Sequence, residues 1–251
     1  RKNRKTQNGL RSWKRRLPTN TCLECQNRCL AAGSLPPQSL KRGEVGILDK
    51  SIPYQNIIMC AERENLLCLK EPTLPSGFSF RLFCPGDEKQ WARLEWQVGE
   101  FATEKEAIDY FSQNYLAFET LLRQRCWFIW DEEKDQAAAT ATAWFEQVSG
   151  GERLASLHWV STAPYCQRKG LGRAIVVRAL KTLAQTENSQ LVYLHTQTWS
   201  HQAVRLYLSL GFGAVRQGSF SRYSNDYPLY LSALWEKMPL KDYETFLKNL
   251  V

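Results

Sequence analysis

The sequence predicts a mixed α/β domain preceded by an irregular N-terminal extension, and three observations support this prediction. Short apolar or alternating runs bounded by Gly, Pro and Asp indicate strands. Between them lie longer runs whose apolar residues recur every three or four positions, which indicates amphipathic helices. A glycine-bearing loop then joins one strand directly to a helix that is followed by another strand, and such a β-loop-α-β unit has parallel strands.

The predicted elements begin at residue 78 with an alternating strand over 78–83. Two helices follow, one carrying apolar residues over 91–101 and one running from a Thr103 cap to residue 122, with Glu106 completing a capping box. The later strands are predicted at 126–130, 137–145, 153–162, 191–196, 212–219 and 227–234, and the later helices at 171–183, 203–210 and 240–250.

The N-terminal extension, residues 1–76, differs in composition from the domain expected at residues 77–251. Gly and Pro punctuate residues 30–76, so the boundary is expected near residue 76. Of the 33 basic residues, eight lie in residues 1–20 without any acidic neighbour, so the net charge of +8 belongs to this tail. A solvated arm is favoured over a nucleic-acid contact, because such a tail attracts polyanions without specificity.

Composition excludes several classes of protein. With 43% hydrophobic and 23% charged residues the chain is not expected to be disordered, and it has no apolar run of the roughly 18 residues that cross a bilayer. The basic start is not followed by the apolar stretch of a secretory signal. We therefore expect a cytoplasmic protein with no membrane partner, whose eight cysteines are reduced.

Three cysteines, Cys22, Cys25 and Cys29, are the only group with a spacing that suits a metal. Zinc prefers four such ligands, and Cys60 or Cys68 is the candidate for the fourth. A second cysteine pair is missing, and all three histidines lie far downstream. Free thiols in a loose arm are therefore the favoured interpretation, and no metal is expected.

The segment Gln167-Arg-Lys-Gly-Leu-Gly172 is the clearest chemical motif, because it lies between a predicted strand and a predicted helix. Glycines at a helix start aim backbone N–H groups outward, where the helix dipole favours an anion such as a pyrophosphate. Arg168, Lys169 and Arg173 add positive charge. The spacing matches neither the Walker loop nor the dinucleotide fingerprint, and a simple strand-to-helix turn is the alternative.

Two ordered blocks carry a resemblance to a known family. The block Pro164-Tyr-Cys-Gln-Arg-Lys-Gly-Leu-Gly172 matches the Gln/Arg-x-x-Gly-x-Gly/Ala signature of the GNAT family of acyl-CoA-dependent N-acetyltransferases. The block Ala203-Val-Arg-Leu-Tyr-Leu-Ser-Leu-Gly-Phe212 is similar to the family's Ala-x-x-Leu-Tyr-x-x-x-Gly-Phe helix. The resemblance covers about residues 78–235. It implies a mixed, mostly antiparallel sheet with a central V-shaped splay, flanked by helices.

The resemblance also implies a site for acetyl-CoA in that splay. Backbone groups of Val160, Ser161 and Thr162 are expected to pair with the pantetheine arm. Ser200 stands where many members carry Asn, so its hydroxyl is a less assured contact. The pyrophosphate is expected on the phosphate loop and the residue after it: Gln167, Arg168, Lys169, Gly170, Leu171, Gly172 and Arg173.

Tyr207 is the candidate general acid, because the family places a tyrosine there near the CoA sulfur; a packed core aromatic is the alternative. Glu100 is the first candidate for the base that takes the acceptor's proton, with Glu146 and His158 as others, and a water chain can serve instead. Cys166 beside the loop is expected to fill space rather than to catalyse.

The resulting prediction is an N-acetyltransferase that moves an acetyl group from acetyl-CoA to a primary amine. The acceptor is expected to be a small-molecule amine or a protein amine, and a homodimer is left open. The alternative function is a CoA-sensing or nucleic-acid-associated binding module without turnover. Aromatic residues hint at an apolar acceptor pocket: Trp91, Trp96, Phe101, Trp144 and Trp159.

Overall fold

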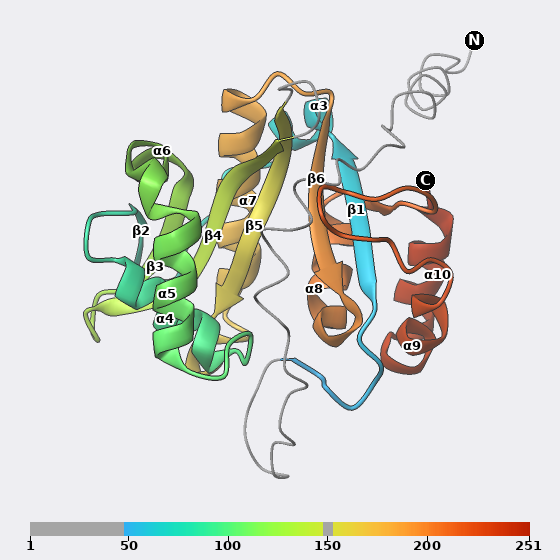
Figure 1. Ribbon diagram of the computed structural model, residues 1–251, viewed down its shortest axis with the longest axis horizontal. Helices are drawn as coiled ribbons and strands as arrows, with labels where there is room; N and C mark the ends of the chain where they lie inside the picture. The colour runs from blue at the N-terminus through green and yellow to red at the C-terminus, as the bar shows by residue number, and fades with distance from the viewer. Residues whose placement is uncertain (1–47, 148–152) are drawn as a thin grey trace.

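The computed structural model describes residues 48–147 and 153–251. A seven-stranded sheet in the order β2-β3-β4-β5-β6-β1-β7 forms the centre of the molecule (Figure 1). Its strands are β1 (Asn56–Glu62), β2 (Phe78–Leu82), β3 (Cys126–Asp131), β4 (Gln136–Gln147), β5 (Arg153–Thr162), β6 (Leu191–Gln197) and β7 (Gly213–Ala214). Only the β5–β6 pair is parallel, so the predicted mixed, mostly antiparallel sheet is confirmed.

Helices cover both faces of the sheet. In Figure 1 α7 lies behind β4 and β5, with α4 and α5 in front, and α8, α9 and α10 gather beside β6 and β1. The α-helices are α3 (Arg63–Leu67), α4 (Glu88–Gln97), α5 (Glu104–Asn114), α6 (Glu119–Arg125), α7 (Leu171–Thr186), α8 (His201–Ser209), α9 (Tyr230–Lys237) and α10 (Leu240–Lys248). Short 3₁₀ turns are η1 (Leu116–Phe118), η2 (Pro164–Cys166) and η3 (Thr198–Ser200).

The parallel strands β5 and β6 diverge. Their register runs only from Ala155 opposite Val192 to Leu157 opposite Leu194, although both strands continue beyond these pairs. The result is the V-shaped splay that the sequence analysis expected, with its open end at the carboxyl ends of both strands (Figure 1). Backbone groups on the inner edges of this V have no strand partner across it, so they are available to a ligand.

A β-bulge lies on β5 beside the V. Thr140 of β4 pairs with Ser161, whereas Thr142 pairs with His158, so the β5 side holds one extra residue. Trp159 inside the bulge has a φ of 48°, a left-handed conformation that costs energy for a residue with a large side chain. Its indole Nε1 donates to the Tyr115 hydroxyl at 2.9 Å, and this bond holds the Trp159 side chain in the direction that the bulge gives it.

Strand β1 was assigned to the extension, and the structure corrects this. Residues 56–62 pair with β6 on one side and with β7 on the other, so the sheet continues past the boundary expected near residue 76. Ile57 and Met59 enter the main core, while Ile58 and Cys60 pack on the opposite face. A strand buried on both faces reads as a continuous apolar run without alternation, which explains the wrong assignment.

Two segments near the C-terminus also differ from expectation. The strand predicted at 212–219 pairs only at Gly213 and Ala214, after which Arg216 N–H bonds to the Val251 carbonyl. The strand predicted at 227–234 is wrong, since α9 occupies Tyr230–Lys237. The buried residues Tyr230, Ala233 and Leu234 follow helical spacing. In so short an apolar run, the helical period of 3.6 residues and the strand period of two are hard to tell apart.

The helix predicted over 103–122 is divided into α5, η1 and α6. Its start is as expected, because the Thr103 side chain accepts the Glu106 N–H at 3.2 Å. It breaks at Tyr115, whose backbone leaves the helical region while its hydroxyl bonds to His158. The helix expected at 240–250 is confirmed as α10.

None of the helices in the described part of the chain is long and apolar enough to cross a membrane. Cys22, Cys25 and Cys29 lie outside the described residues. Cys60 lies in β1 and Cys68 follows α3, and residues 48–147 and 153–251 contain no cluster of three or more His, Cys, Asp or Glu side chains that could hold a metal.

Candidate active site

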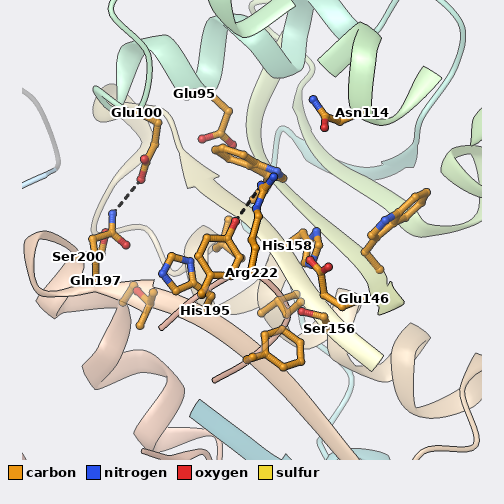
Figure 2. Close-up of a pocket in the computed structure, with 18 of the residues that line it drawn as sticks. Glu95, Glu100, Asn114, Glu146, Ser156, His158, His195, Gln197, Ser200 and Arg222 are labelled. Carbon is orange, nitrogen blue, oxygen red and sulfur yellow. Dashed lines mark hydrogen bonds and ion pairs between the residues drawn. The ribbon is translucent and has the colours of Figure 1, made fainter. Parts of the chain in front are cut away.

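A cavity of about 390 Å³ lies in the V. Its walls come from β4, β5 and β6 below, from α4 and α5 on one side, and from α8 and the segment 220–223 on the other (Figure 2). The cavity brings together eight of the residues predicted for the site: Glu100, Trp144, Glu146, His158, Trp159, Val160, Ser200 and Tyr207.

The edge of β5 offers backbone groups to the V at alternate residues. Ala163 N–H donates to the Ala138 carbonyl at 2.8 Å, and Ser161 pairs with Thr140, so residues 161 and 163 turn their backbone groups toward β4. Because backbone direction alternates along a strand, Val160 and Thr162 turn their N–H and C=O groups to the other side, toward the V. Contrary to expectation, the Ser161 backbone is engaged within the sheet.

The loop after β5 lies outside the cavity but opens at the same end of the V. Gly170 has a φ of 81° and caps the start of α7, and a Cβ placed there would meet no atom within 4 Å. Arg168 is also left-handed, with a φ of 64°. The first N–H groups of the 16-residue helix α7 have no intrahelical acceptor, so the loop can hold an anion.

Close packing holds this loop against β5. A Cβ at Gly172 would lie 3.3 Å from Thr162 Oγ1, which is tighter than ordinary contact. Residue 172 therefore has to be small if α7 is to start directly beside the end of the strand. The side chains of Arg168, Lys169 and Arg173 are exposed around the loop, where they add positive charge.

Tyr207 lies on α8 and is only 5% exposed, facing the cavity. Burial raises the pKa of its hydroxyl far above 10, and the nearby carboxylates Glu100 and Glu95 raise it further. Among the described residues the hydroxyl has no hydrogen-bond partner. A protonated phenol without a partner can donate to a group in the cavity. Ser200 precedes α8 and also lines the cavity, and its side chain makes no capping bond.

Two carboxyl groups lie on the α4 side of the cavity. Glu100 is an exposed residue that lines the cavity, and its carboxylate accepts a bond from Gln197 Nε2 at 3.3 Å. Surrounding protein atoms desolvate it and raise its pKa, while Gln197 and the positive charge of Lys50 limit that rise. The Lys50 ammonium donates to the Gly99 carbonyl at 3.0 Å.

Glu95 is a cavity residue that sequence reasoning missed. It is 1% exposed, and its Oε1 has no hydrogen-bond partner in the described structure. Burial raises its pKa to about 8, and the nearby charge of Glu100 adds to this rise. The signal was present in the sequence, because Glu95 lies four residues after Trp91 on the apolar face of α4.

A hydrogen-bonded chain crosses the floor of the cavity. The Tyr115 hydroxyl lies 2.9 Å from His158 Nδ1, and His158 Nε2 lies 3.2 Å from Glu146 Oε1. Ser221 donates to the other carboxylate oxygen of Glu146 at 2.7 Å. Burial alone would raise the pKa of Glu146, but the bond and charge of His158 outweigh it and lower that pKa.

The remaining wall carries a cation and a neutral imidazole. Arg222 points into the cavity, where its Nη2 bonds to the hydroxyls of Tyr110 and Tyr223 (Figure 2). His195 stacks on Tyr223 with ring centroids 3.6 Å apart. Burial and the charge of Arg222 lower the pKa of His195 to about 4. Sequence reasoning missed this wall, because no motif marks these residues.

The comparisons with known proteins agree with this architecture. Residues 89–212 match the family model described as the acetyltransferase (GNAT) family. The resemblance to the GNAT family that the two sequence blocks indicated is therefore confirmed over residues 89–212. The matched segment begins in α4 and ends after α8, so it contains the V, the loop at α7 and Tyr207, but neither β1 nor the segment with Arg222.

Two curated relatives are named mycothiol acetyltransferase. The one from Rothia mucilaginosa is 28% identical over 153 residues, which cover 57% of this chain and 43% of that protein. The one from Amycolatopsis mediterranei is 29% identical over 152 residues, covering 57% of this chain and 48% of the relative. The chain thus spans less than half the length of these relatives.

Solved structures of GNAT proteins are also similar. A tandem GNAT protein from the clavulanic acid biosynthesis pathway has a TM-score of 0.49 at 18% identity, over 66% of this chain and 51% of that one. A GCN5-related N-acetyltransferase from Sphaerobacter thermophilus has a TM-score of 0.47 at 19% identity, over 65% and 49% of the two chains.

Proposed function

We propose that this chain transfers an acetyl group from acetyl-CoA to a primary amine. The observation that carries the proposal is the meeting of a buried phenol, Tyr207, and two carboxyl groups, Glu95 and Glu100, in one cavity at the end of the V. An amine that attacks a thioester must lose a proton, and the departing thiolate must gain one. This cavity holds a group for each task.

The loop and the edge of β5 fit the donor, whose thioester supplies the activated acetyl group. We assign the diphosphate to the N–H groups from Gln167 to Gly172 and to the charges of Arg168, Lys169 and Arg173, because the left-handed Gly170 leaves open space above the loop. Val160 and Thr162 would bond the pantetheine arm through their backbone groups, and Ser200 would contact it from α8.

Tyr207 is proposed as the general acid. Its high pKa keeps the phenol protonated at neutral pH, so a proton is available when the carbon–sulfur bond breaks. The proton passes from the phenol to sulfur as the carbon–sulfur bond breaks, and the resulting phenolate takes a proton from solvent before the next turnover. The free hydroxyl in the cavity supports this role over that of a purely packed aromatic.

Glu100 is proposed as the base that receives the acceptor's proton, directly or through a water. Its accessible carboxylate, with a pKa raised by desolvation yet limited by Lys50, is closer to the strength that this transfer needs than an ordinary surface carboxylate. Glu95, with a pKa of about 8, is protonated near neutral pH and is less suited to this task. Glu146 and His158 are already bound to each other.

The other expectations remain proposals of the same kind. The acceptor would be a small-molecule amine or a protein amine, which is consistent with relatives named for acetylation of mycothiol. The predictions for the basic residues 1–20 and for Cys22, Cys25 and Cys29 concern residues outside the described part of the chain. The protein would work in the cytoplasm, as a monomer or a homodimer.

The test is release of free CoA thiol from acetyl-CoA with a panel of primary amines. We expect release that depends on an amine and is strongly reduced in Tyr207→Phe, while CoA binding measured by calorimetry is unchanged. Tight CoA binding with no thiol released for any amine would instead support the CoA-sensing module. Absence of CoA binding by the folded protein would overturn both functions.

A further inference from the structure

Arg222 is a cation without a counter-ion at the edge of the cavity. Its two contacts on Nη2, at 3.2 Å and 3.1 Å, go to the neutral hydroxyls of Tyr110 and Tyr223. Over the described residues it forms no ion pair with a carboxylate, and its Nε and Nη1 atoms have no hydrogen-bond partner there. Three of the five guanidinium donors are thus available to a ligand.

The position of this guanidinium is fixed by its neighbours, unlike that of a typical surface arginine. Tyr223 stacks on His195, which in turn bonds to Asn56 Oδ1 in β1 at 2.8 Å. Tyr110 packs on Trp159 with ring centroids 5.1 Å apart. Both phenols therefore belong to packed walls, and an arginine held between them is preorganised for one ligand geometry.

The nearby groups form no ion pair with this charge in the described part of the chain. Glu146 is close enough for its carboxylate and Arg222 to attract each other, but its two oxygens bond to Ser221 and His158 and not to the guanidinium. His195 is neutral at physiological pH, because burial and the charge of Arg222 lower its pKa. A cation at the solvent-exposed edge of the cavity, with free donors and no ion-paired carboxylate among the described residues, is expected to attract an anionic group.

We propose that the acceptor is an amine that also carries an anionic group, a carboxylate or a phosphate, which Arg222 binds while the amine faces Glu100. This inference rests on the proposed acetyl transfer and names the class of acceptor. Carboxylate and phosphate share the feature that matters, two or more oxygens that accept from one guanidinium. Both groups line the same cavity but come from different segments: Glu100 follows α4, and Arg222 lies in the segment 220–223 (Figure 2).

The experiment compares pairs of amines that differ in the anionic group. L-phenylalanine is paired with phenethylamine and O-phosphoethanolamine with ethanolamine, and glucosamine represents neutral hydroxylated amines. For at least one pair we expect the anionic member to be preferred in kcat/KM by about tenfold or more, as for a site that hydrogen-bonds one substrate group. Which pair shows the preference separates carboxylate from phosphate.

Two variants test whether Arg222 carries the preference. In Arg222→Gln the ratio of kcat/KM between the anionic and the neutral amine should fall close to one, while KM for acetyl-CoA is unchanged. Arg222→Lys should restore part of this ratio. The matched control is Arg216→Gln, an exposed arginine on the same segment outside the cavity, which should leave the preference intact.

The possible failures are distinguishable. If phenethylamine, ethanolamine or glucosamine is turned over faster than both anionic amines, this inference is wrong but acetyl transfer is still supported. The same holds if Arg222→Gln keeps the full preference for the anionic amine. No thiol release with any amine overturns the proposed function, and this inference with it.

Discussion

The two sides of the V are built in different ways. On the loop side, the end of β5, the loop 167–172 and the start of α7 are consecutive in the chain, and their anion-binding capacity comes mainly from backbone N–H groups. On the cavity side, Tyr54, Glu95, Tyr110, Glu146 and Arg222 come from five segments spread over most of the described chain. Side chains, not backbone, determine the chemistry there.

Because of this difference, we expect different kinds of substitution to impair ligand binding on the two sides. A backbone site tolerates exchange of its exposed side chains but not of the glycines that set its conformation. A site assembled from distant side chains can change its ligand through one substitution while the fold is kept. The four predictions below test this division, from the largest expected effect to the smallest.

Tyr207 lies where the two sides meet, and Tyr207→Phe should have the largest effect. Loss of the donor hydroxyl should lower kcat by about 100-fold or more, which is typical of a general acid, with little change in the affinity for CoA. Steady-state thiol release and calorimetry measure the two quantities. A kcat within a few-fold of the parent would mean that Tyr207 is only a packed aromatic.

Glu95→Gln tests the buried carboxyl group on the cavity side through stability. The folded-state pKa of about 8 is above the unfolded value, so the stability linked to this proton is full below about pH 4 and is lost as the pH rises toward 8. The variant should therefore gain stability over the parent by a few kcal/mol at pH 8 and little at pH 4. Urea unfolding at both pH values measures this, and an equal difference at both would contradict it.

Gly170→Val tests the loop side. The left-handed φ of 81° is unfavourable for a β-branched residue, so the loop should change conformation and the affinity for CoA should fall by about tenfold. The preference among amines should stay the same. Gly86→Val is the matched control, because Gly86 has a φ of 101° with equally open surroundings in a distant loop. Equal losses of CoA affinity in both variants would point to general destabilisation.

Lys50→Ala should have the smallest effect, on the pH dependence of turnover. Without the nearby ammonium the pKa of Glu100 should rise, so the acidic limb of the kcat/KM profile should move to higher pH. Lys50→Arg should restore the parent profile. An acidic limb that stays in place would indicate that another group receives the proton.

The sequence predicted the loop side well because its information is local. The glycine spacing, the preceding strand and the following helix are adjacent in the chain, and they indicated the parallel pair; the V was expected only from the resemblance to the GNAT family. The cavity side was predicted only where a residue lay near a recognised strand or helix, as with Glu100, Glu146 and His158. Arg222 and Tyr54 are brought in by chain segments whose path no local pattern specifies.

Strand β1, which was not predicted, also shows that local sequence patterns do not specify long-range contacts. Its five consecutive buried residues carry no alternation, and it is inserted between β6 and β7 from a distant part of the sequence. Pairing of that kind depends on long-range contacts that a window of neighbouring residues does not contain. Glu95 differs, because a carboxylate on the apolar face of α4 was a visible signal.

The short pairing between β5 and β6 has a mechanical consequence. Three residue pairs, from Ala155–Val192 to Leu157–Leu194, form the direct ladder between the four strands on one side of the sheet and the three on the other. Elsewhere side-chain hydrogen bonds also link the two halves, such as those from Gln197 to Glu100 and from Arg222 to Tyr110. A substrate that replaces one of these bonds therefore exchanges a polar link between the two halves for its own contacts.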